Sequence, residues 1–279
     1  MHTTITEYTV EEFRKMLREE EKSDATIEKY GAVLEKLRLW LNGNEVTKQR
    51  LTDYRQELLQ SQSAGTVNGA ISAINTWLNY IGLEKMRIKF LKVQKKAFCS
   101  AKKELSREEY NRLVAAAKRA GDERLLLVME TICFTGIRVS EIRYITAEAV
   151  ENGRAEISLK GKNRTILLPG KLCRRLRKYA RKQKIISGAL FLTRNRTPLG
   201  RKQIWAQMKA LCASAGVDPS KVFPHNLRHL FARCFYKSTH DVAKLADVLG
   251  HSSINTTRIY MVTSGAEHIR TLDRMQLVS

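Results

Sequence analysis

Apolar residues in the first ninety positions recur every three or four residues, which is the spacing of one buried face of an α-helix. The longest such stripe comprises Ile27, Tyr30, Val33, Leu34, Leu37 and Leu41. Residues 51–58 and 67–81 repeat the pattern, and an earlier stripe follows Thr9–Glu12, which we interpret as a capping box. Residues 1–90 are therefore predicted to form a helical domain of four amphipathic helices.

The helical pattern stops where lysines replace the apolar positions. These lysines are Lys89, Lys92, Lys95, Lys96, Lys102 and Lys103. We interpret residues 91–103 as a basic linker, with an ordinary exposed loop as the alternative. Ser106–Glu109 then has the form of a capping box and opens a new helical segment, so a second domain is predicted over residues 104–279.

The second domain combines helices with one β-hairpin. Ala155, Ile157 and Leu159 alternate with polar residues, as in a half-buried strand, and a return strand is expected over 165–168. Lys160 then lies at the tip of the hairpin, on its polar side. Helices are predicted over 171–182, 203–213, 227–236, 241–249 and 254–260. The expected fold class is mainly α with a small β-hairpin: a helical domain followed by a mixed α/β domain.

The charge balance indicates a polyanionic partner. The chain has 50 Lys and Arg against 28 Asp and Glu, a formal net charge of +22. Nucleic acid is the commonest partner for such a surplus, and a membrane surface is the alternative. No apolar stretch approaches the ~20 residues that span a bilayer, and no secretory signal is visible. The five cysteines are odd in number and form no CxxC pair, which favours reduced thiols and a cytoplasmic location.

Four segments of the second domain carry residues suited to one phosphate site. They are Thr135–Ile142, the hairpin tip, Pro224–His229, and Leu249–Ser253 followed by Tyr260. The candidate residues are Arg138, Lys160, His225, Arg228, His251 and Tyr260. Guanidinium groups donate paired hydrogen bonds to phosphate oxygens and stay charged at any working pH. A tyrosine with a reference pKa near ~10 needs a cationic pocket or a base to act as a nucleophile.

The strings TGIRVSEI, HNLRH and LGHSSINTTRIY, in this order, closely resemble the tyrosine recombinase (phage integrase) family, with its Xer, Cre and integrase branches. The resemblance covers nearly the whole chain, and the spacing of nine from His251 to Tyr260 is the usual one in that family. It implies that the six candidate residues are the catalytic set, with Tyr260 as nucleophile, and that Glu141 supports Arg138. No candidate position departs from the family pattern.

The resemblance also implies the reaction and its partners. A site-specific DNA recombinase of this kind cuts and rejoins DNA through a 3′-phosphotyrosyl intermediate and a Holliday junction, without a cofactor or a metal. The implied partner is double-stranded DNA with paired inverted-repeat binding sites. A monomer in free solution and a homo-tetramer in the synaptic complex are expected, in a bacterial or mobile-element-encoded enzyme. A type IB topoisomerase-like enzyme and a non-catalytic DNA-binding protein are the alternatives.

Several residues keep more than one interpretation. His225 and His229 are four apart, a spacing that can bind metal, but no third ligand is evident and a structural role is favoured for His229. Lys160 rather than Lys162 is predicted to be the general acid, because it is the last strand residue before a glycine. Lys162 and Arg164 are then candidates for DNA-backbone contacts. The three tryptophans, Trp40, Trp77 and Trp205, lie either in the core or facing DNA. A C-terminal apolar stripe docks either on a neighbouring protomer or on its own domain; it comprises Ile269, Leu272 and Met275.

Overall fold

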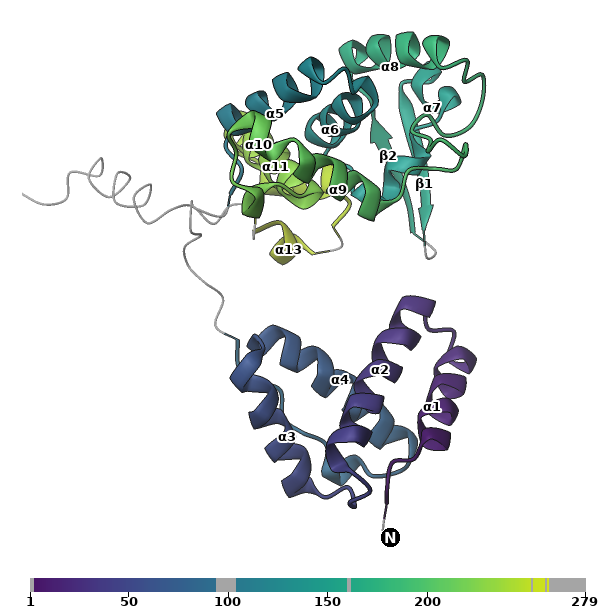
Figure 1. Ribbon diagram of the computed structural model, residues 1–279, viewed down its shortest axis with the longest axis vertical. Coiled ribbons are helices and arrows are strands. Elements are labelled where there is room, and N and C mark those ends of the chain that lie inside the picture. The colour runs from purple at the N-terminus through teal and green to yellow at the C-terminus, as the bar shows by residue number, and fades with distance from the viewer. Residues whose placement is uncertain (1–2, 94–103, 160–161, 252, 259, 261–279) are drawn as a thin grey trace, which may run out of the picture. The chain divides into compact units, whose positions relative to one another are not determined.

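The computed structural model describes residues 3–93, 104–159, 162–251, 253–258 and 260 (Figure 1). The chain divides into two compact units, Met1–Lys95 and Lys96–Ser279, and each is described by itself. The expected C-terminal stripe at 269–275, Cys99 and the lysines of the linker beyond Lys92 lie outside the described residues.

The first unit consists of α-helices and one short 3-10 helix. Its elements are α1 (Glu7–Glu19), α2 (Asp24–Leu41), α3 (Lys48–Ser61), α4 (Ala64–Tyr80) and η1 (Glu84–Met86). Their apolar faces meet in one core that contains Phe13, Leu37 and Trp77, all fully buried. Trp77 is therefore a core residue, whereas the half-buried Trp40 donates a hydrogen bond to the Glu57 carboxylate.

The predicted capping box at Thr9–Glu12 is wrong. The helix begins at Glu7, and the reciprocal hydrogen bonds join Thr6 and Thr9, each backbone N–H donating to the other hydroxyl at 3.2 Å. Thr9 therefore takes the place of the Glu or Gln that a capping box usually carries at this position. The second predicted box is confirmed, because the Ser106 and Glu109 side chains each accept the other backbone N–H.

The second unit is also mostly helical and contains one hairpin. Its helices are α5 (Arg107–Arg119), α6 (Glu123–Thr135), η3 (Val139–Tyr144), α7 (Ala147–Glu151), α8 (Gly170–Lys182), α9 (Arg201–Ala210), α10 (Cys212–Ala215), η4 (Pro219–Lys221), α11 (Pro224–Thr239), α12 (Val242–Leu249) and α13 (Ile254–Arg258). Helix α6 is buried along most of its length and packs against α5, α8 and α11. The fold class predicted from the sequence is confirmed.

The hairpin pairs β1 (Arg154–Leu159) with β2 (Lys162–Leu167) in antiparallel register, with Ile157 opposite Arg164. Only two residues connect the strands, a length common in hairpins. The prediction that Lys162 lies inside the turn is therefore wrong, because Lys162 pairs with Leu159 as the first residue of β2. Lys160 itself lies outside the described residues.

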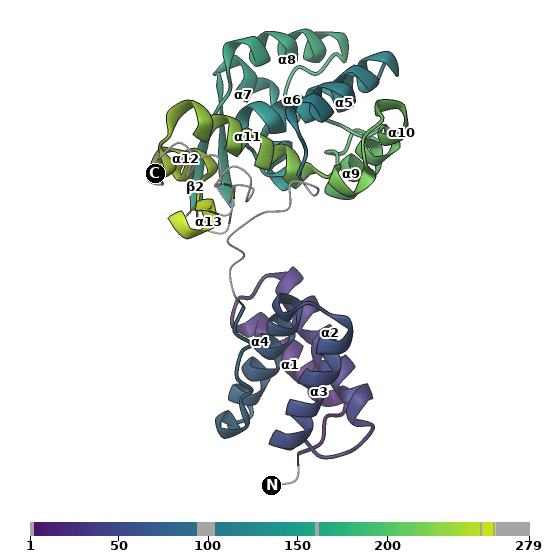
Figure 2. The ribbon, with the colours of Figure 1, turned by 90° about the vertical axis from the view of Figure 1, so that its left-hand side faces the viewer.

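Helices α8 and α13 lie on opposite sides of the second unit. Figure 1 and the perpendicular view of Figure 2 agree on this arrangement, with α6 and α11 between them. No described helix is long and apolar enough to cross a bilayer.

Candidate active site

The first arginine, Arg138, follows directly on the end of α6. Gly136 ends that helix with a left-handed φ of 63°, and a Cβ atom there would lie 2.5 Å from the Phe231 ring. Glycine is required at this position for both reasons. The chain then turns into η3, which begins immediately after Arg138, so that Glu141 lies one turn along on the same side.

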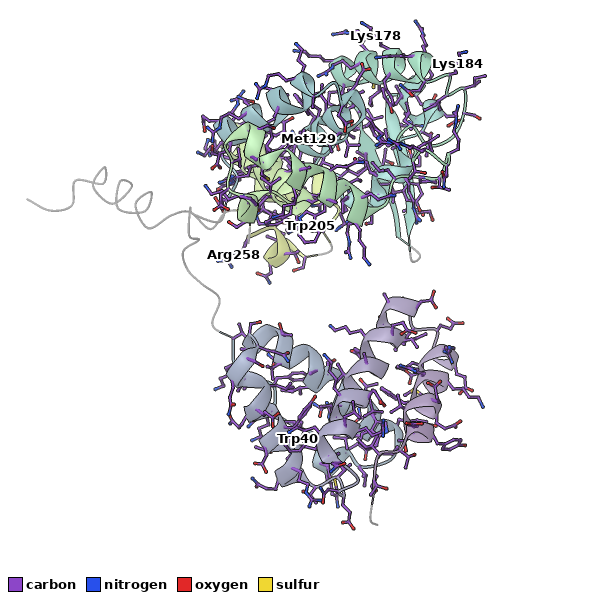
Figure 3. All side chains as sticks on the ribbon, viewed as in Figure 1. Trp40, Met129, Lys178, Lys184, Trp205 and Arg258 are labelled. Atoms are coloured by element: carbon purple, nitrogen blue, oxygen red, sulfur yellow. The ribbon has the colours of Figure 1, made fainter. Side chains whose placement is uncertain are left out.

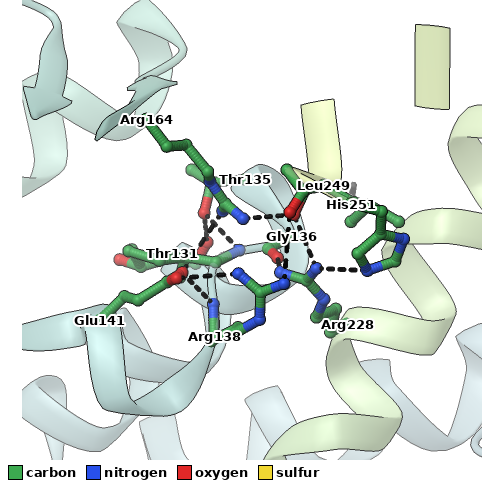
Figure 4. Close-up of polar contacts among 11 residues, drawn as sticks. Thr131, Thr135, Gly136, Arg138, Glu141, Arg164, Arg228, Leu249 and His251 are labelled. Atoms are coloured by element: carbon green, nitrogen blue, oxygen red, sulfur yellow. Dashed lines mark hydrogen bonds and ion pairs between the residues drawn. The ribbon is translucent and has the colours of Figure 1, made fainter. Parts of the chain in front are cut away.

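Glu141 is the buried anion beneath this part of the site. Its carboxylate accepts the Arg138 backbone N–H at 2.9 Å and the Arg138 Nη1 at 3.0 Å. Arg164 Nη2 from β2 forms an ion pair at 3.3 Å with Glu141 Oε2, the oxygen that also accepts the Arg138 backbone N–H. The Glu141 side chain is 4% exposed, whereas that of Arg138 is 42% exposed. Glu141 therefore fixes Arg138 through the hydrogen bonds drawn in Figure 4, while the guanidinium remains partly open to solvent.

Arg228 is held near the start of α11, which opens with Pro224, three residues before the predicted start at 227. The Arg228 residue is buried, and its guanidinium donates to the carbonyl oxygens of Gly136 and, at 2.8 Å, Leu249. Burial lowers its pKa, and a hydrogen bond with the Tyr260 hydroxyl opposes that shift. Arg228 thus ties together the ends of α6 and α12.

His251 is positioned by the left-handed C-cap of α12, Gly250, whose φ is 62°. Its Nε2 lies 3.0 Å from Arg228 Nη2, and its Nδ1 lies 2.8 Å from Thr257 Oγ1. Because a guanidinium only donates, Nε2 is the acceptor and Nδ1 carries the proton. Burial and the nearby Arg228 lower the pKa of His251 to about 4, so this imidazole is neutral at neutral pH.

Tyr260 lies against three imidazoles and is 7% exposed. Its ring stacks on His251 with an interplanar angle of 8° and a centroid separation of 5.7 Å. The His229 ring meets it edge-on at 4.4 Å, and the His225 ring lies at 6.1 Å. Arg138, His225, Arg228, His251 and Tyr260 all line one open pocket of about 740 Å³.

The remaining imidazoles differ in exposure. His225 is exposed at the pocket, while His229 is half-buried beneath it, and their rings lie 4.6 Å apart. Loss of hydration among the packed side chains of the pocket, followed by the nearby Arg228, lowers the pKa of His225, although part of its ring stays exposed. Burial lowers the pKa of His229 to about 4. Within the part of the chain that the structure describes, no three His, Cys, Asp or Glu side chains cluster as metal ligands. The contacts of His229 are those of a residue that supports the Tyr260 ring.

Arg164 has a different position from the one its sequence suggested. Its side chain is 11% exposed, pairs with Glu141, and donates to the Leu249 carbonyl oxygen that also accepts from Arg228. Burial lowers its pKa to about 10, which still leaves it charged at neutral pH. These protein contacts favour a supporting role for Arg164 over a contact with the DNA backbone. Arg164 fills the space beside Gly250, where a Cβ atom would lie 2.3 Å from its Cδ.

Three other residues of the site were not identified from the sequence. Thr257 fixes the His251 tautomer, and the backbone carbonyl groups of Gly136 and Leu249 hold Arg228. Only Thr257 carries a sequence signal, a hydroxyl six residues after a histidine, and that signal is weak alone. Trp205 of α9 is 49% exposed and lines the pocket, so it is not a core residue.

The comparisons with known proteins identify the family of the chain. A model of the phage integrase family matches residues 103–266, more than half of the chain, and the chain belongs to that family. It is a tyrosine site-specific recombinase, an enzyme of DNA strand exchange.

Relatives match along most of the chain. The tyrosine recombinase XerA of Pyrococcus furiosus is 28% identical over 96% of this chain and 93% of its own length. The tyrosine recombinase XerD of Rhizobium meliloti is 30% identical over 90% of this chain and 89% of its own length.

Solved structures share the fold at lower sequence identity. A XerH site-specific recombinase bound to its difH substrate has a TM-score of 0.71 at 20% identity, covering 96% of this chain and 84% of its own. A lambda integrase tetramer bound to a Holliday junction has a TM-score of 0.73 at 18% identity, covering 92% and 78%.

Proposed function

We propose that this chain cuts one strand of double-stranded DNA with the Tyr260 hydroxyl and rejoins the broken end to a strand of a partner site. The observation that carries the proposal is the pocket itself. It brings the buried Tyr260 together with Arg138, Arg228 and His251. Such a pocket suits a phosphodiester, whose oxygens gain negative charge as it is attacked.

Each chemical step exchanges one phosphoester for another. The Tyr260 oxygen forms a bond to phosphorus, and the bond from phosphorus to the 5′-oxygen breaks. The products are a 3′-phosphotyrosyl link and a 5′-hydroxyl whose proton comes from Lys160. A 5′-hydroxyl of the partner duplex then attacks the phosphorus and gives its proton to Lys160. The bond from phosphorus to the Tyr260 oxygen breaks, and Tyr260 recovers its proton from His225. Two rounds pass through a Holliday junction, and no external energy source is needed because ester bonds are conserved.

The side chains divide the remaining work. Arg138 and Arg228 donate to the non-bridging oxygens, and Glu141 holds Arg138 in place. His251, neutral with its proton on Nδ1, is oriented by Thr257, and its Nε2 accepts a hydrogen bond from Arg228. His225 is exposed at the pocket, and its lowered pKa keeps it available to accept the proton of Tyr260. This scheme requires no cofactor or metal.

The partner in this proposal is double-stranded DNA with paired inverted-repeat sites. The net charge of +22 supports it, as do the solved relatives bound to DNA. We further propose that the chain is a monomer in free solution and a homo-tetramer in the synaptic complex, as in the lambda integrase tetramer. It would act in the cytoplasm of a prokaryote. The relatives include both bacterial and archaeal recombinases, which supports a prokaryotic host without deciding between the two groups.

Strand joining between two separate DNA sites distinguishes a recombinase from an enzyme that only relaxes supercoiled DNA. Two duplexes of different length that carry the same selected site are incubated with the protein. Recombinant products of new length are expected. Relaxation of supercoiled DNA without any product of new length would instead support the topoisomerase-like alternative, and an intact substrate without adduct would support a binding protein.

The first prediction separates Lys160 from Lys162 as general acid. Lys160→Ala should cleave normal DNA poorly, by roughly 100-fold or more, because the departing 5′-oxygen then lacks a proton donor. It should cleave DNA with sulfur at the 5′-bridging position well, since a thiolate leaves without protonation. The measurement is the single-turnover cleavage rate on both substrates, with Lys162→Ala as the matched control. Selective rescue of Lys162→Ala instead would assign the acid to Lys162.

The second prediction concerns Arg164, which contacts protein groups rather than solvent. Arg164→Ala removes one donor from the Glu141 carboxylate and one from the Leu249 carbonyl oxygen. Each keeps a second donor, because Arg138 still binds Glu141 and Arg228 still binds Leu249. We expect slower cleavage, by roughly tenfold, because these groups lose their alignment. The slope of log affinity against log salt should not change. In the control Lys202→Ala, at the exposed rim of the pocket, that slope should fall by about 0.9. An equal fall in Arg164→Ala would restore its role as a DNA contact.

A further inference from the structure

The outer face of α8 is a strongly basic surface that the pocket does not use. This helix contains seven Lys or Arg among its 13 residues and no Asp or Glu. Four of the seven are spaced three or four residues apart and therefore share one side of the helix. These exposed residues, here called the α8 basic face, are Lys171, Arg174, Lys178 and Arg181.

The opposite side of α8 is already occupied by the protein core. Leu172, Leu176 and Tyr179 are buried against the rest of the second unit. The helix therefore has no free apolar side to insert into a membrane surface. Only its charged side is available to a partner.

Neighbouring carboxylates neutralise the flanks of α8 but not this face. Their ion pairs are Arg175–Glu130, Arg177–Glu151 at 3.0 Å and Lys182–Glu123 at 2.8 Å. Among the residues that the structure describes, none of the four side chains of the α8 basic face forms an ion pair. Like charges at this spacing destabilise a helix, and a bound polyanion would remove that repulsion.

The α8 basic face also lies far from the pocket in space. Lys178 and Lys184 lie on the upper side of the second unit in Figure 3, while Trp205 of the pocket and Arg258 of α13 lie on the lower side. The two views of the ribbon agree that α8 and α13 are on opposite sides. A short straight duplex in the pocket therefore does not reach α8.

We propose that the α8 basic face binds the phosphate backbone of a second segment of double-stranded DNA. From Lys171 to Arg181 the helix rises by about 15 Å. A duplex carries one charge per ~1.7 Å of its axis, so a segment of that length presents about nine phosphate charges to these four cations. Lys and Arg contacts to phosphate carry no sequence information, so the binding is independent of sequence. Such a surface retains the chain on DNA that flanks a site, or holds a neighbouring duplex.

The test uses the full chain with Tyr260→Phe, so that no covalent link forms, and a short labelled duplex of arbitrary sequence. A photoreactive p-benzoylphenylalanine in place of Lys178 should crosslink to this duplex, and one in place of Lys118 on α5 should not. In titrations at low salt, the chain should bind two duplexes. The triple variant Arg174→Gln, Lys178→Gln, Arg181→Gln should bind one, and the salt slope of the second association should fall by about 2.7.

The matched control removes the same charge from three exposed side chains on other elements, as Lys118→Gln, Arg194→Gln, Arg196→Gln. It should still bind two duplexes. Loss of the second duplex in both triple variants, or in neither, would overturn the proposal. The proposal would also fail if α8 bound phosphatidylglycerol vesicles and did not bind the duplex. With Tyr260 present, the α8 triple variant should keep adduct formation on nicked DNA, so a failure of the cleavage chemistry is recognised separately.

Discussion

The variant Tyr260→Phe is expected to form no covalent adduct with DNA while binding DNA as the unmodified protein does. The substitution removes the nucleophilic oxygen and leaves the ring, which packs against His229 and His251. Arg228 loses one hydrogen-bonding partner but keeps the Gly136 and Leu249 carbonyl oxygens. The pocket should therefore retain its shape and its charge.

The measurement is denaturing gel electrophoresis after incubation with a nicked suicide substrate. The short fragment released by the cut diffuses away, so the strand cannot be rejoined and the adduct accumulates. Tyr236→Phe is the matched control, because it removes a hydroxyl from a half-buried tyrosine on α11 outside the pocket. That control should form the adduct at the normal rate. A persistent adduct in Tyr260→Phe would mean that another residue is the nucleophile.

Arg138→Ala is expected to slow cleavage by about 100-fold to 1000-fold without unfolding the protein. Losing one preorganised donor to a developing oxyanion costs about this much in other enzymes. The fold should survive because Glu141 keeps its ion pair with Arg164. Arg228→Ala is a poorer test, since it leaves two backbone carbonyl groups with fewer donors in the protein interior and lowers the free energy of unfolding as well.

A substrate with a neutral methylphosphonate at the scissile position makes this prediction specific to charge. Replacing a charged oxygen by methyl removes much of the need for the guanidinium, so the difference between Arg138→Ala and the unmodified protein should shrink. Single-turnover rates on both substrates, with thermal unfolding as the folding control, measure it. An undiminished difference on the methylphosphonate would indicate that Arg138 acts through structure and not through the phosphate charge.

The sequence predicted the elements that carry the site because each depends on a local pattern. Pro224 at the start of α11 and Gly250 at the end of α12 mark helix ends through their own backbone chemistry. The stripe that ends at Leu41 needed only helical periodicity. The capping box at Thr6 and Thr9 was missed because two threonines there make the reciprocal bonds that Glu12 was expected to help make.

The position of Arg164 could not be predicted, because it depends on contacts between distant segments. Its partners Glu141 and Leu249 come from η3 and α12, and only the packed structure brings them to β2. The charge of a residue in a hairpin is as well suited to DNA as to a buried carboxylate. The position of Arg138 could be predicted, because the residues that fix it, Gly136 and Glu141, lie in the same short stretch of sequence.

The most direct test of the account is to identify the residue that carries DNA after cleavage by the unmodified chain. The adduct from the suicide substrate, formed in excess EDTA, is digested with protease and nuclease, and the modified peptide is sequenced by mass spectrometry. We expect a nucleotide phosphate on the Tyr260 oxygen, linked through the 3′ side of the cut strand, with a yield that EDTA does not lower. A phosphate on any other residue, a link through the 5′ side, or a loss of adduct in EDTA that a divalent cation restores would contradict the account.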